Sequence, residues 1–240
     1  NCNTLGANTV TLTVNDGHGN AATCTAIVTV SDAMPPTALC RDVVVQLDGN
    51  GNALLTAAQV NNGSTDNCAL GPLSVAPNAF TLADLGLNTV TLTVNDANGN
   101  SSTCSAQVTV ENNQLPNAVC QNITRNLGTN GSITITPAEV DGGSTALGGI
   151  QSSNVSPSTL TCANIGPNTV TLTITGNNGK QSSCNATVTV NDNTPPTAIC
   201  QNVSVNLSGS SASVTAAQVN NGSTDNCGTV NLVGVTPNTF

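Results

Sequence analysis

Apolar and polar residues alternate strictly in a stretch of seven residues that the chain carries three times. It reads Asn-Thr-Val-Thr-Leu-Thr-Val at 8–14 and at 88–94, and ends in Ile instead of Val at 168–174. Alternation with a period of two is typical of a strand with one buried face. The pattern therefore predicts the same half-buried β-strand in three repeats.

A second alternating strand follows each of these, after a turn rich in Asn and Gly. The Asn-Gly pairs at 98–99 and 178–179 supply the positive φ that a tight hairpin requires. We therefore predict a hairpin in each repeat, with one face directed inward. In the second repeat the inward residues are Val90, Leu92, Val94, Cys104, Ala106, Val108 and Val110, and Thr89, Thr91 and Thr93 take the other face.

Strands and cysteines recur in one register of 80 residues. This step is longer than that of a solenoid, roughly 20 to 50 residues, and is long enough for each unit to own a core. Both ends of the chain cut the repeat at the same phase, so we expect a window on a longer array. The predicted domains are a truncated β-sandwich repeat at 1–34, complete repeats at 35–114 and 115–194, and a truncated repeat at 195–240.

The rest of the repeat predicts short strands and one helical turn. In the third repeat, strands are expected at 118–127 and 132–136, whereas 150–160 is weakly patterned. Thr136, Pro137 and Glu139 form a capping sequence with Pro at the first helical position. Short strands joined by Gly, Pro and Asn turns indicate an all-β fold of tandem antiparallel sandwiches, and the Pro-Pro linkers favour an extended rod.

Composition narrows the possible partners and the compartment. Lys and Arg number 3 against 12 Asp and Glu, a net charge of −9, which argues against nucleic acid and anionic membranes as partners. No stretch is apolar enough to insert into a membrane. Ten cysteines indicate an oxidising, extracellular place or a cell surface. Trp and Tyr are missing and Phe numbers 2, which disfavours a carbohydrate-binding array.

The cysteines occupy four positions of the repeat. The first holds Cys40, Cys120 and Cys200, the second Cys68 and Cys227, the third Cys2 and Cys162, and the fourth Cys24, Cys104 and Cys184. Only the first and fourth are filled wherever the chain shows them. This predicts the disulfides Cys40–Cys104 and Cys120–Cys184, with loops of about 65 residues worth roughly 4 kcal/mol each.

The second and third positions are then expected to pair within a complete repeat. Leu82 replaces the third in one repeat and Gly148 replaces the second in the next, which leaves Cys68 and Cys162 as unpaired candidates. A buried free thiol is the favoured interpretation, and a cross-link between chains or repeats is the alternative. The partners of Cys2, Cys24, Cys200 and Cys227 are expected beyond the window.

Metal sites and catalysis have little support in the residues. Cys-x-x-Cys pairs are missing and His18 is the single histidine, so neither a zinc site nor a nucleophile with its base is expected, and we predict no enzyme. Carboxylates near turns and linkers, at Asp32, Glu111 and Asp16 among others, could hold calcium and stiffen a rod. The alternative is that Asp and Asn favour turns on their own. The calcium candidates are Asp66, Asp96, Asp192 and Asp225.

Three motifs together resemble a known family. They are Pro-Pro-Thr-Ala-Ile-Cys at 195–200, Asn-Asn-Gly-Ser-Thr-Asp-Asn-Cys at 61–68, and the hairpin sequence that begins at 88. They are similar to the hyalin-type repeat, and the similarity covers the whole chain. The resemblance implies an immunoglobulin-like extracellular module in long surface proteins, usually without catalysis. The cysteines missing at 82 and 148 depart from the four-cysteine form.

These observations predict a structural protein. We expect a repeat region of a long secreted or cell-surface filament that provides length, stiffness and resilience through disulfide-stapled domains. Its partners would be neighbouring repeats of the same chain, and identical chains if the filament has several. The alternative is the stalk of an adhesin whose binding head lies outside the window, stiffened by calcium.

Overall fold

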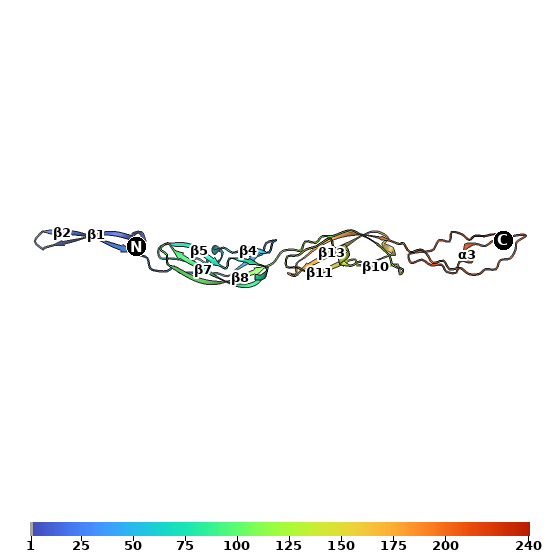
Figure 1. The fold of residues 1–240 in the computed structure, drawn as a ribbon, viewed down its shortest axis with the longest axis horizontal. Helices are drawn as coiled ribbons and strands as arrows, with labels where there is room; N and C mark the ends of the chain where they lie inside the picture. The colour runs from blue at the N-terminus through green and yellow to red at the C-terminus, as the bar shows by residue number, and fades with distance from the viewer. Residues whose placement is uncertain (1) are drawn as a thin grey trace. The chain divides into compact units, whose positions relative to one another are not determined.

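The structure is a computed structural model that describes residues 2–240, and it contains two compact units (Figure 1). One unit ends at Gln114 and the other begins at Leu115, which is one of the three boundaries that the repeat predicts. The boundaries near 34 and 194 stay predictions. Each unit is described by itself below.

Both units are built from short strands with single helical turns. The first contains η1 (Cys2–Thr4), β1 (Gly6–Asn15), β2 (Ala21–Val30), β3 (Val43–Gln46), β4 (Asn52–Leu54), α1 (Ala57–Val60), β5 (Leu70–Ala76), β6 (Ala79–Thr81), η2 (Leu82–Asp84), β7 (Gly86–Asp96) and β8 (Ser101–Glu111). The second contains β9 (Ile123–Asn126), β10 (Ser132–Thr134), α2 (Pro137–Val140), β11 (Ile150–Ser156), β12 (Thr159–Thr161), η3 (Cys162–Asn164), β13 (Gly166–Gly176), β14 (Gln181–Asn191) and α3 (Ala216–Val219). The fold is all-β, as predicted.

The complete repeat of each unit has the same sheet topology. Its main sheet has four strands, in the order β3-β8-β7-β5 in the first unit and β11-β13-β14-β9 in the second. Neighbours are antiparallel except for the opening and closing strands, which run parallel, with Val43 opposite Val108 and Gln46 opposite Glu111. A small sheet, β4-β6 or β10-β12, supplies the second layer. Each repeat is therefore a small sandwich whose first and last strands are neighbours.

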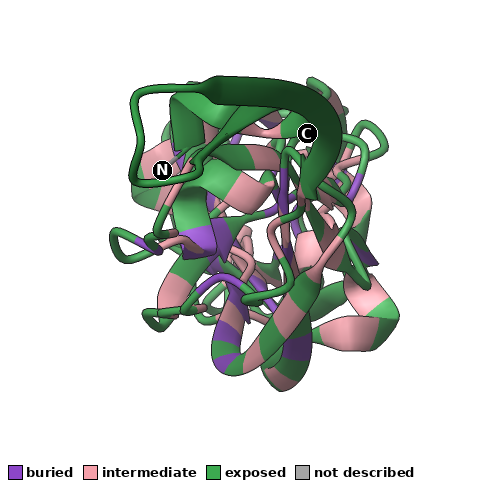
Figure 2. Cartoon of the chain, turned by 90° about the vertical axis from the view of Figure 1, so that its left-hand side faces the viewer, coloured by how far each residue is buried: buried purple, intermediate pink, exposed green. Residues whose placement is uncertain are grey.

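The core lies on the inward faces of the long hairpins. Burial alternates along β7 and β8, and Figure 2 shows such banding along the strands. Leu92 is 0% exposed and pairs across the hairpin with Cys104. Phe80 on β6 is the one aromatic core residue among the described residues, and Leu160 takes its place in the second unit. The predicted inward residues are confirmed, except that Cys104 is only partly buried: Val90, Leu92, Val94, Ala106, Val108 and Val110.

The local signals for turns are also confirmed. Glu139 accepts hydrogen bonds from the backbone N–H of Thr136 at 2.7 Å and from its hydroxyl at 2.8 Å, which caps α2 as the sequence predicts. Gly99 follows Asn98 at the tip of the hairpin with φ +97°, a left-handed value that favours glycine.

Two strand predictions for the third repeat differ from the structure. The weakly patterned segment 150–160 forms β11 and β12, because β11 pairs with the edge of β13 through its backbone and buries little more than Val155. The predicted strand 118–127 is shortened to β9, because only these residues reach the closing strand β14. Before β9, Asn117 and Cys120 form isolated bridges to the other layer.

The opening segment and the closing strand are joined by a disulfide in each complete repeat. Cys40 bonds Cys104 and Cys120 bonds Cys184, with Cα–Cα distances of 5.9 and 5.8 Å and a sequence separation of 64 in both. These are the two pairs that the sequence predicts. They tie the start of the second layer to the middle of the main sheet.

Removing one of these bonds should cost much of the stability of its repeat. We expect the double substitution Cys120→Ala and Cys184→Ala to lower the free energy of unfolding by roughly 4 kcal/mol, since the unfolded chain regains the entropy of a long loop. Urea titration followed by hydrogen exchange at Val170 and Val188 measures the change in this repeat alone. Equal protection of these amides in both proteins would contradict the prediction.

Candidate functional site

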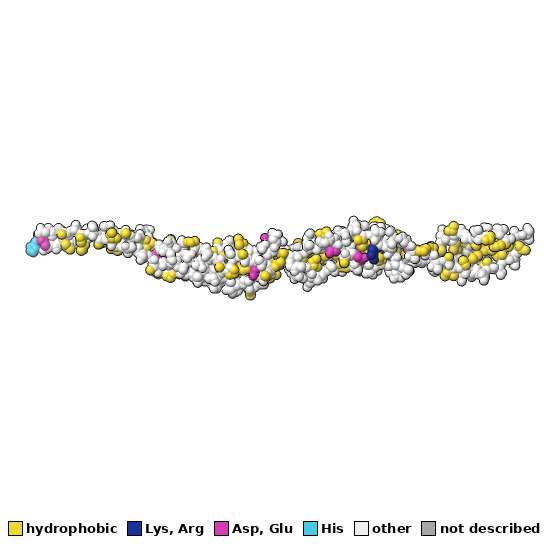
Figure 3. Space-filling model, in the orientation of Figure 1, with side chains coloured by type: hydrophobic (Ala, Val, Ile, Leu, Met, Phe, Trp, Pro, Cys, Tyr) yellow, Lys and Arg dark blue, Asp and Glu magenta, His cyan; other side chains and the backbone are white. Residues whose placement is uncertain are grey.

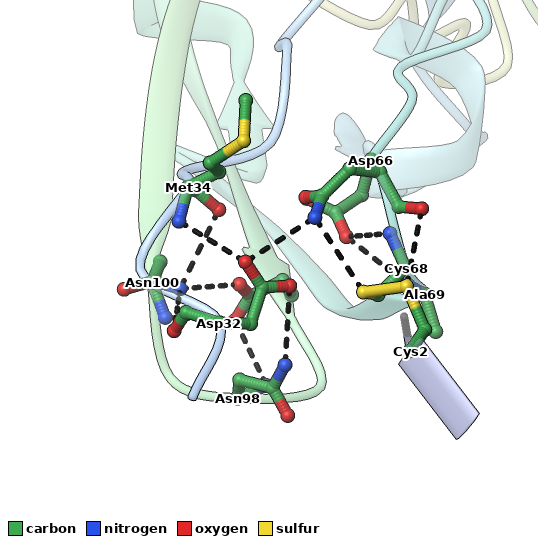
Figure 4. Close-up of a disulfide and its surroundings, with 10 residues drawn as sticks. Cys2, Asp32, Met34, Asp66, Cys68, Ala69, Asn98 and Asn100 are labelled. Atoms are coloured by element: carbon green, nitrogen blue, oxygen red, sulfur yellow. Dashed lines mark hydrogen bonds between the residues drawn. A yellow bond between two sulfur atoms is a disulfide. The ribbon is translucent and has the colours of Figure 1, made fainter. Parts of the chain in front are cut away.

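Two further disulfides connect consecutive repeats. In the first unit Cys2, in η1, bonds Cys68, in the loop between α1 and β5, with a Cα–Cα distance of 5.4 Å (Figure 4). In the second unit Cys162, in η3, bonds Cys227 of the fourth repeat, with a Cα–Cα distance of 5.2 Å. We call these two bonds the clamp disulfides, because each joins one repeat to the next beside their linker.

The clamp disulfides correct three predictions. Cys68 and Cys162, predicted to be free thiols, are both bonded, and Cys2 and Cys227 have partners inside the chain. The second and third cysteine positions also do not pair within a repeat. The reason is that β5 and β6 separate them: β5 spans Leu70–Ala76, which is about 20 Å of extended chain. The cross-link between repeats, the less favoured alternative, is the one that the structure contains.

A polar network surrounds the clamp of the first unit and is centred on Asp32, which lies in the linker (Figure 4). The side-chain amides of Asn67 and Asn98 donate to its two carboxylate oxygens at 3.3 and 3.2 Å. The amide of Asn100 donates to the carbonyl oxygens of Asp32 and Met34 at 3.1 and 3.4 Å. The hairpin turn and the cysteine loop of the second repeat thus hold the end of the first.

Three carboxylates meet in this network. One oxygen each of Asp32, Asp66 and Asp96 lies within 4.8 Å of the others. Asp66 accepts through Oδ2 from the backbone N–H groups of Cys68 and Ala69, at 2.8 and 3.0 Å. Its Oδ1 exposes less than 1 Å² and has no hydrogen-bond partner among the described residues. Two predicted calcium candidates, Asp66 and Asp96, are therefore together, and Asp32 is the member that the prediction left out of its set.

Asp96 is 4% exposed and is fixed by its own turn. The backbone N–H groups of Asn98 and Asn100 donate to Oδ1 at 2.9 and 2.7 Å, and the Asn100 amide donates to Oδ2 at 2.6 Å. Burial acts to raise the pKa of Asp96, but these hydrogen bonds to the charged form outweigh it, so the pKa lies below its ordinary value. Asp96 therefore keeps its negative charge at neutral pH, beside two other carboxylates.

The second unit repeats this arrangement around its own clamp. The Asn226 amide donates to Asp192 Oδ1 at 3.3 Å and to the carbonyl oxygen of Gly128 at 3.2 Å. The backbone N–H of Cys227 donates to Asp225 Oδ2 at 2.9 Å, as that of Cys68 does to Asp66. The predicted candidates Asp192 and Asp225 thus correspond to Asp32 and Asp66. Asp96 lies in the other unit, so the four candidates do not form one set.

The clamp of the second unit also depends on a glycine in the third repeat. Gly131 has φ +70°, and a Cβ there would come within 2.7 Å of both the Asn226 carbonyl oxygen and the Cys162 sulfur. The Cys162 thiol sulfur lies 3.4 Å from the Gly131 carbonyl oxygen as well. Only glycine lets the two repeats approach this closely.

The boundary at 114–115 has lost both features together. One step of 80 residues from Cys2 and Cys68 leads to Leu82 and Gly148, so the two missing cysteines are the two halves of one clamp. The same step from the acidic and amide positions leads to other residues as well. They are Asn112 for Asp32, Ala146 for Asp66, Leu147 for Asn67, Gly176 for Asp96 and Lys180 for Asn100.

The remaining chemically reactive side chains lie away from the clamps. Cys24 and Cys200 are free and exposed in the structure. Their predicted partners beyond the window stay a prediction. His18 lies at the exposed tip of the hairpin between β1 and β2, where its Nδ1 is 3.0 Å from the Asp16 carbonyl oxygen.

Helices in the described part of the chain are too short and too polar to cross a bilayer. No family model matches the sequence, and no curated protein matches it. The resemblance to hyalin-type repeats therefore stays a prediction.

Solved structures give distant matches. The chain matches an endo-fucoidan hydrolase of glycoside hydrolase family 107 with 12% identity and a TM-score of 0.26, over 79% of this chain and 34% of that one. It matches protocadherin gamma B7 extracellular cadherin domains 1–4 with 13% identity and a TM-score of 0.32, over 86% and 64%.

Titin domains I67–I69 match with 13% identity and a TM-score of 0.31, over 77% of this chain and 75% of that one. The chain spans less than two thirds of the hydrolase and protocadherin chains. At these TM-scores the likeness carries no inference about binding or activity.

Opening one clamp should release the neighbouring partial repeat and leave the sandwich intact. We expect Cys2→Ser with Cys68→Ser to reduce hydrogen-exchange protection along β1 and β2 by up to about a thousandfold, which corresponds to the roughly 4 kcal/mol of a closed loop of this length. Protection of Val90 and Leu92 should stay unchanged, since Cys40–Cys104 remains.

The matched control is Cys162→Ser with Cys227→Ser, which should loosen residues 195–240 and leave β1 and β2 as they were. Both variants are measured by exchange and mass spectrometry. If the first variant kept its hairpin fully protected, the clamp would have no structural role.

Proposed function

We propose that this chain is an extracellular structural repeat region that carries tension, as part of a long secreted or cell-surface filament. The observation that supports it best is the overlap of its disulfide-closed loops. Cys40 lies inside the loop that Cys2–Cys68 closes, and Cys104 lies outside it. The loops closed by Cys120–Cys184 and Cys162–Cys227 overlap in the same way.

Overlapping loops limit how far a pulled chain can lengthen. Between Cys2 and Cys104 the shortest covalent path crosses both sulfur bridges and includes only the stretch from Cys40 to Cys68 (68 − 40 = 28 residue steps). At 3.3–3.6 Å per residue, that stretch reaches roughly 100 Å, against about 350 Å for the unbridged chain. A stretched unit therefore retains most of its residues behind covalent bonds.

The parallel pairing of the first and last strands also suits tension. A force along the chain pulls β3 toward its N-terminal end and β8 toward its C-terminal end. Because the two strands are parallel, from Val43 opposite Val108 to Gln46 opposite Glu111, the force shears all their hydrogen bonds together. The Cys40–Cys104 bond lies on the same load path and takes the force once these hydrogen bonds break.

The disulfides also support an extracellular location. Four bonds in a chain of 240 residues persist in oxidising surroundings and are rare where thiols are kept reduced. Charged side chains are sparse, as the few coloured magenta or dark blue in Figure 3 show. The partners in this proposal are the neighbouring repeats, joined covalently at each clamp.

Force spectroscopy of the chain, held at its two ends, tests the proposal. Without reductant, the first unit should release roughly 100 Å between Cys2 and Cys104, and after reduction about 350 Å. The double substitution Cys40→Ser and Cys104→Ser serves as a control that lengthens the oxidised release without reductant. Equal release lengths with and without reductant would show that the disulfides do not bear load.

The alternative function, an adhesin stalk stiffened by calcium, has one observation in its favour. Oxygen ligands of one Ca²⁺ ion lie at 2.3–2.6 Å from it, and so at most about 5 Å from each other. The oxygens of Asp32, Asp66 and Asp96 meet this limit, and the buried Asp66 Oδ1 lacks a partner among the described residues. We propose on this basis that the clamp of the first unit can bind Ca²⁺.

Calorimetry with and without Ca²⁺ tests the ion. Binding should raise the unfolding midpoint of the first unit, by about 2.7 kcal/mol in free energy at a hundredfold excess over Kd. Asp66→Asn should abolish this gain and, without Ca²⁺, leave the midpoint equal or higher, since one of three like charges is gone. Asp48→Asn, in a turn outside the cluster, is the control. A chelator without effect on the midpoint would rule the ion out.

A further inference from the structure

The hairpin of β1 and β2 presents a core face to solvent. Its inward residues are identical to those of the hairpin one repeat later, yet Leu12 is 60% exposed and Leu92 is 0% exposed. The other pairs of corresponding residues show the same contrast: Val10 and Val90, Val14 and Val94, and Val28 and Val108. The free thiol of Cys24 lies on this hairpin, opposite Leu12, as Cys104 lies opposite Leu92.

The segment 195–240 presents the complementary part of a sandwich. It contains the helical turn α3 and the bridges Thr197↔Thr224 and Cys200↔Asn220. The same bridges open the second repeat, as Thr37↔Thr65 and Cys40↔Asn61. The second layer of a repeat is therefore already formed in this segment.

The main sheet of that repeat is not formed. Residues 203–206 correspond to β3 and residues 230–236 to β5, but neither stretch is a strand. Apolar side chains that are core elsewhere are open here: Leu207 is 69% exposed against 1% for Leu47, and Phe240 is 64% exposed against 2% for Phe80. In the complete repeats, the strands between these two edges belong to the long hairpin.

A groove marks the place of the absent hairpin. It has a volume of about 290 Å³ and is lined by apolar side chains on both sides, with the free Cys200 among them. The lining residues that face it from the different segments include Ile199, Ala216, Val219, Val230 and Val235. Figure 3 shows yellow apolar side chains gathered over this segment.

We propose that the hairpin of one copy of this chain inserts into the segment 195–240 of a second copy and completes its sandwich. The occupant follows from the chain itself, because the same hairpin sequence fills the same place in the second and third repeats. Residues 28–31 would pair in parallel with 203–206, as 108–111 pair with 43–46. Each copy offers one hairpin and one open segment, so copies add head to tail.

The joint would then be sealed by a bond between Cys24 and Cys200 of different copies, equivalent to Cys40–Cys104. The reaction consumes one oxidised glutathione: the two protein thiols lose two protons and two electrons, which convert it into two reduced glutathiones. This proposal deepens the filament function, but does not rest on it. Its failure would leave the disulfide-limited release length untouched.

Two single variants of the whole chain test the joint. Cys24→Ser keeps only the thiol at 200, and Cys200→Ser keeps only the thiol at 24. Mixed in a glutathione redox buffer, they should form a covalent dimer of twice the 23.8 kDa of one chain and nothing larger, with a single Cys24–Cys200 peptide in the non-reducing map. Each variant alone should form no covalent dimer.

A face variant and its matched control separate insertion from chance oxidation. Leu12→Asp places a charge on the inward face and should abolish both the dimer in the mixture and the non-covalent oligomers of the unoxidised chain. Thr11→Asp, on the outward face of the same strand, should assemble normally. Light scattering after size exclusion measures both, and hydrogen exchange at Val90 and Val170 verifies that the complete repeats stay folded.

Three outcomes would overturn the proposal. The chain could stay monomeric at all concentrations, each variant could form dimers with itself through like cysteines, or Leu12→Asp could assemble as well as Thr11→Asp. A Cys24–Cys200 bond found within a single wild-type chain would exclude the second copy as the occupant. A covalent dimer of the mixed variants that is lost with Leu12→Asp supports it.

Discussion

The bond between the opening segment and the closing strand is the interaction on which each sandwich depends. A repeat of 80 residues buries little apolar surface, and its core consists of Val, Leu, Ile and Ala around a single Phe or Leu on the short second layer. Small domains of this kind are marginal on burial alone. The disulfide compensates by constraining the unfolded chain, and it does so at the point where the first and last strands meet. Stability and load path therefore share one bond.

Much of the sandwich could be predicted from sequence because its signals are local. Strict alternation identified the inward faces of β7 and β8, and Thr136 with Glu139 identified the capped turn of α2. The strand β11 carries no such signal, because Ile-Gln-Ser-Ser-Asn-Val-Ser is ordered by backbone pairing with β13 rather than by its own pattern. The parallel neighbour of β14 is a matter of topology and also leaves no trace in the local sequence.

The clamps were missed for a different reason. Pairing the second and third cysteines inside a repeat ignores the direction of the chain, which runs through β5 and β6 between these positions and carries them away from each other. A signal was nevertheless present. Leu82 and Gly148 are 66 residues apart, the same separation as Cys2 and Cys68, so their joint departure indicates one lost bond between repeats. Asp32 escaped the calcium set because only the fold brings the linker to the hairpin turn.

The cysteines and the carboxylates change together along the chain, and electrostatics gives a reason. Three carboxylates within 4.8 Å repel one another, and the repulsion is tolerated only where something else holds the groups together. At the first clamp, the Cys2–Cys68 bond and the amides of Asn67, Asn98 and Asn100 do so. Where Leu82 and Gly148 remove the bond, Asn112, Ala146 and Gly176 also remove every charge. The acidic cluster is therefore best understood as a dependent of the covalent clamp, and an ion that bound there would reinforce a junction that sulfur has already closed.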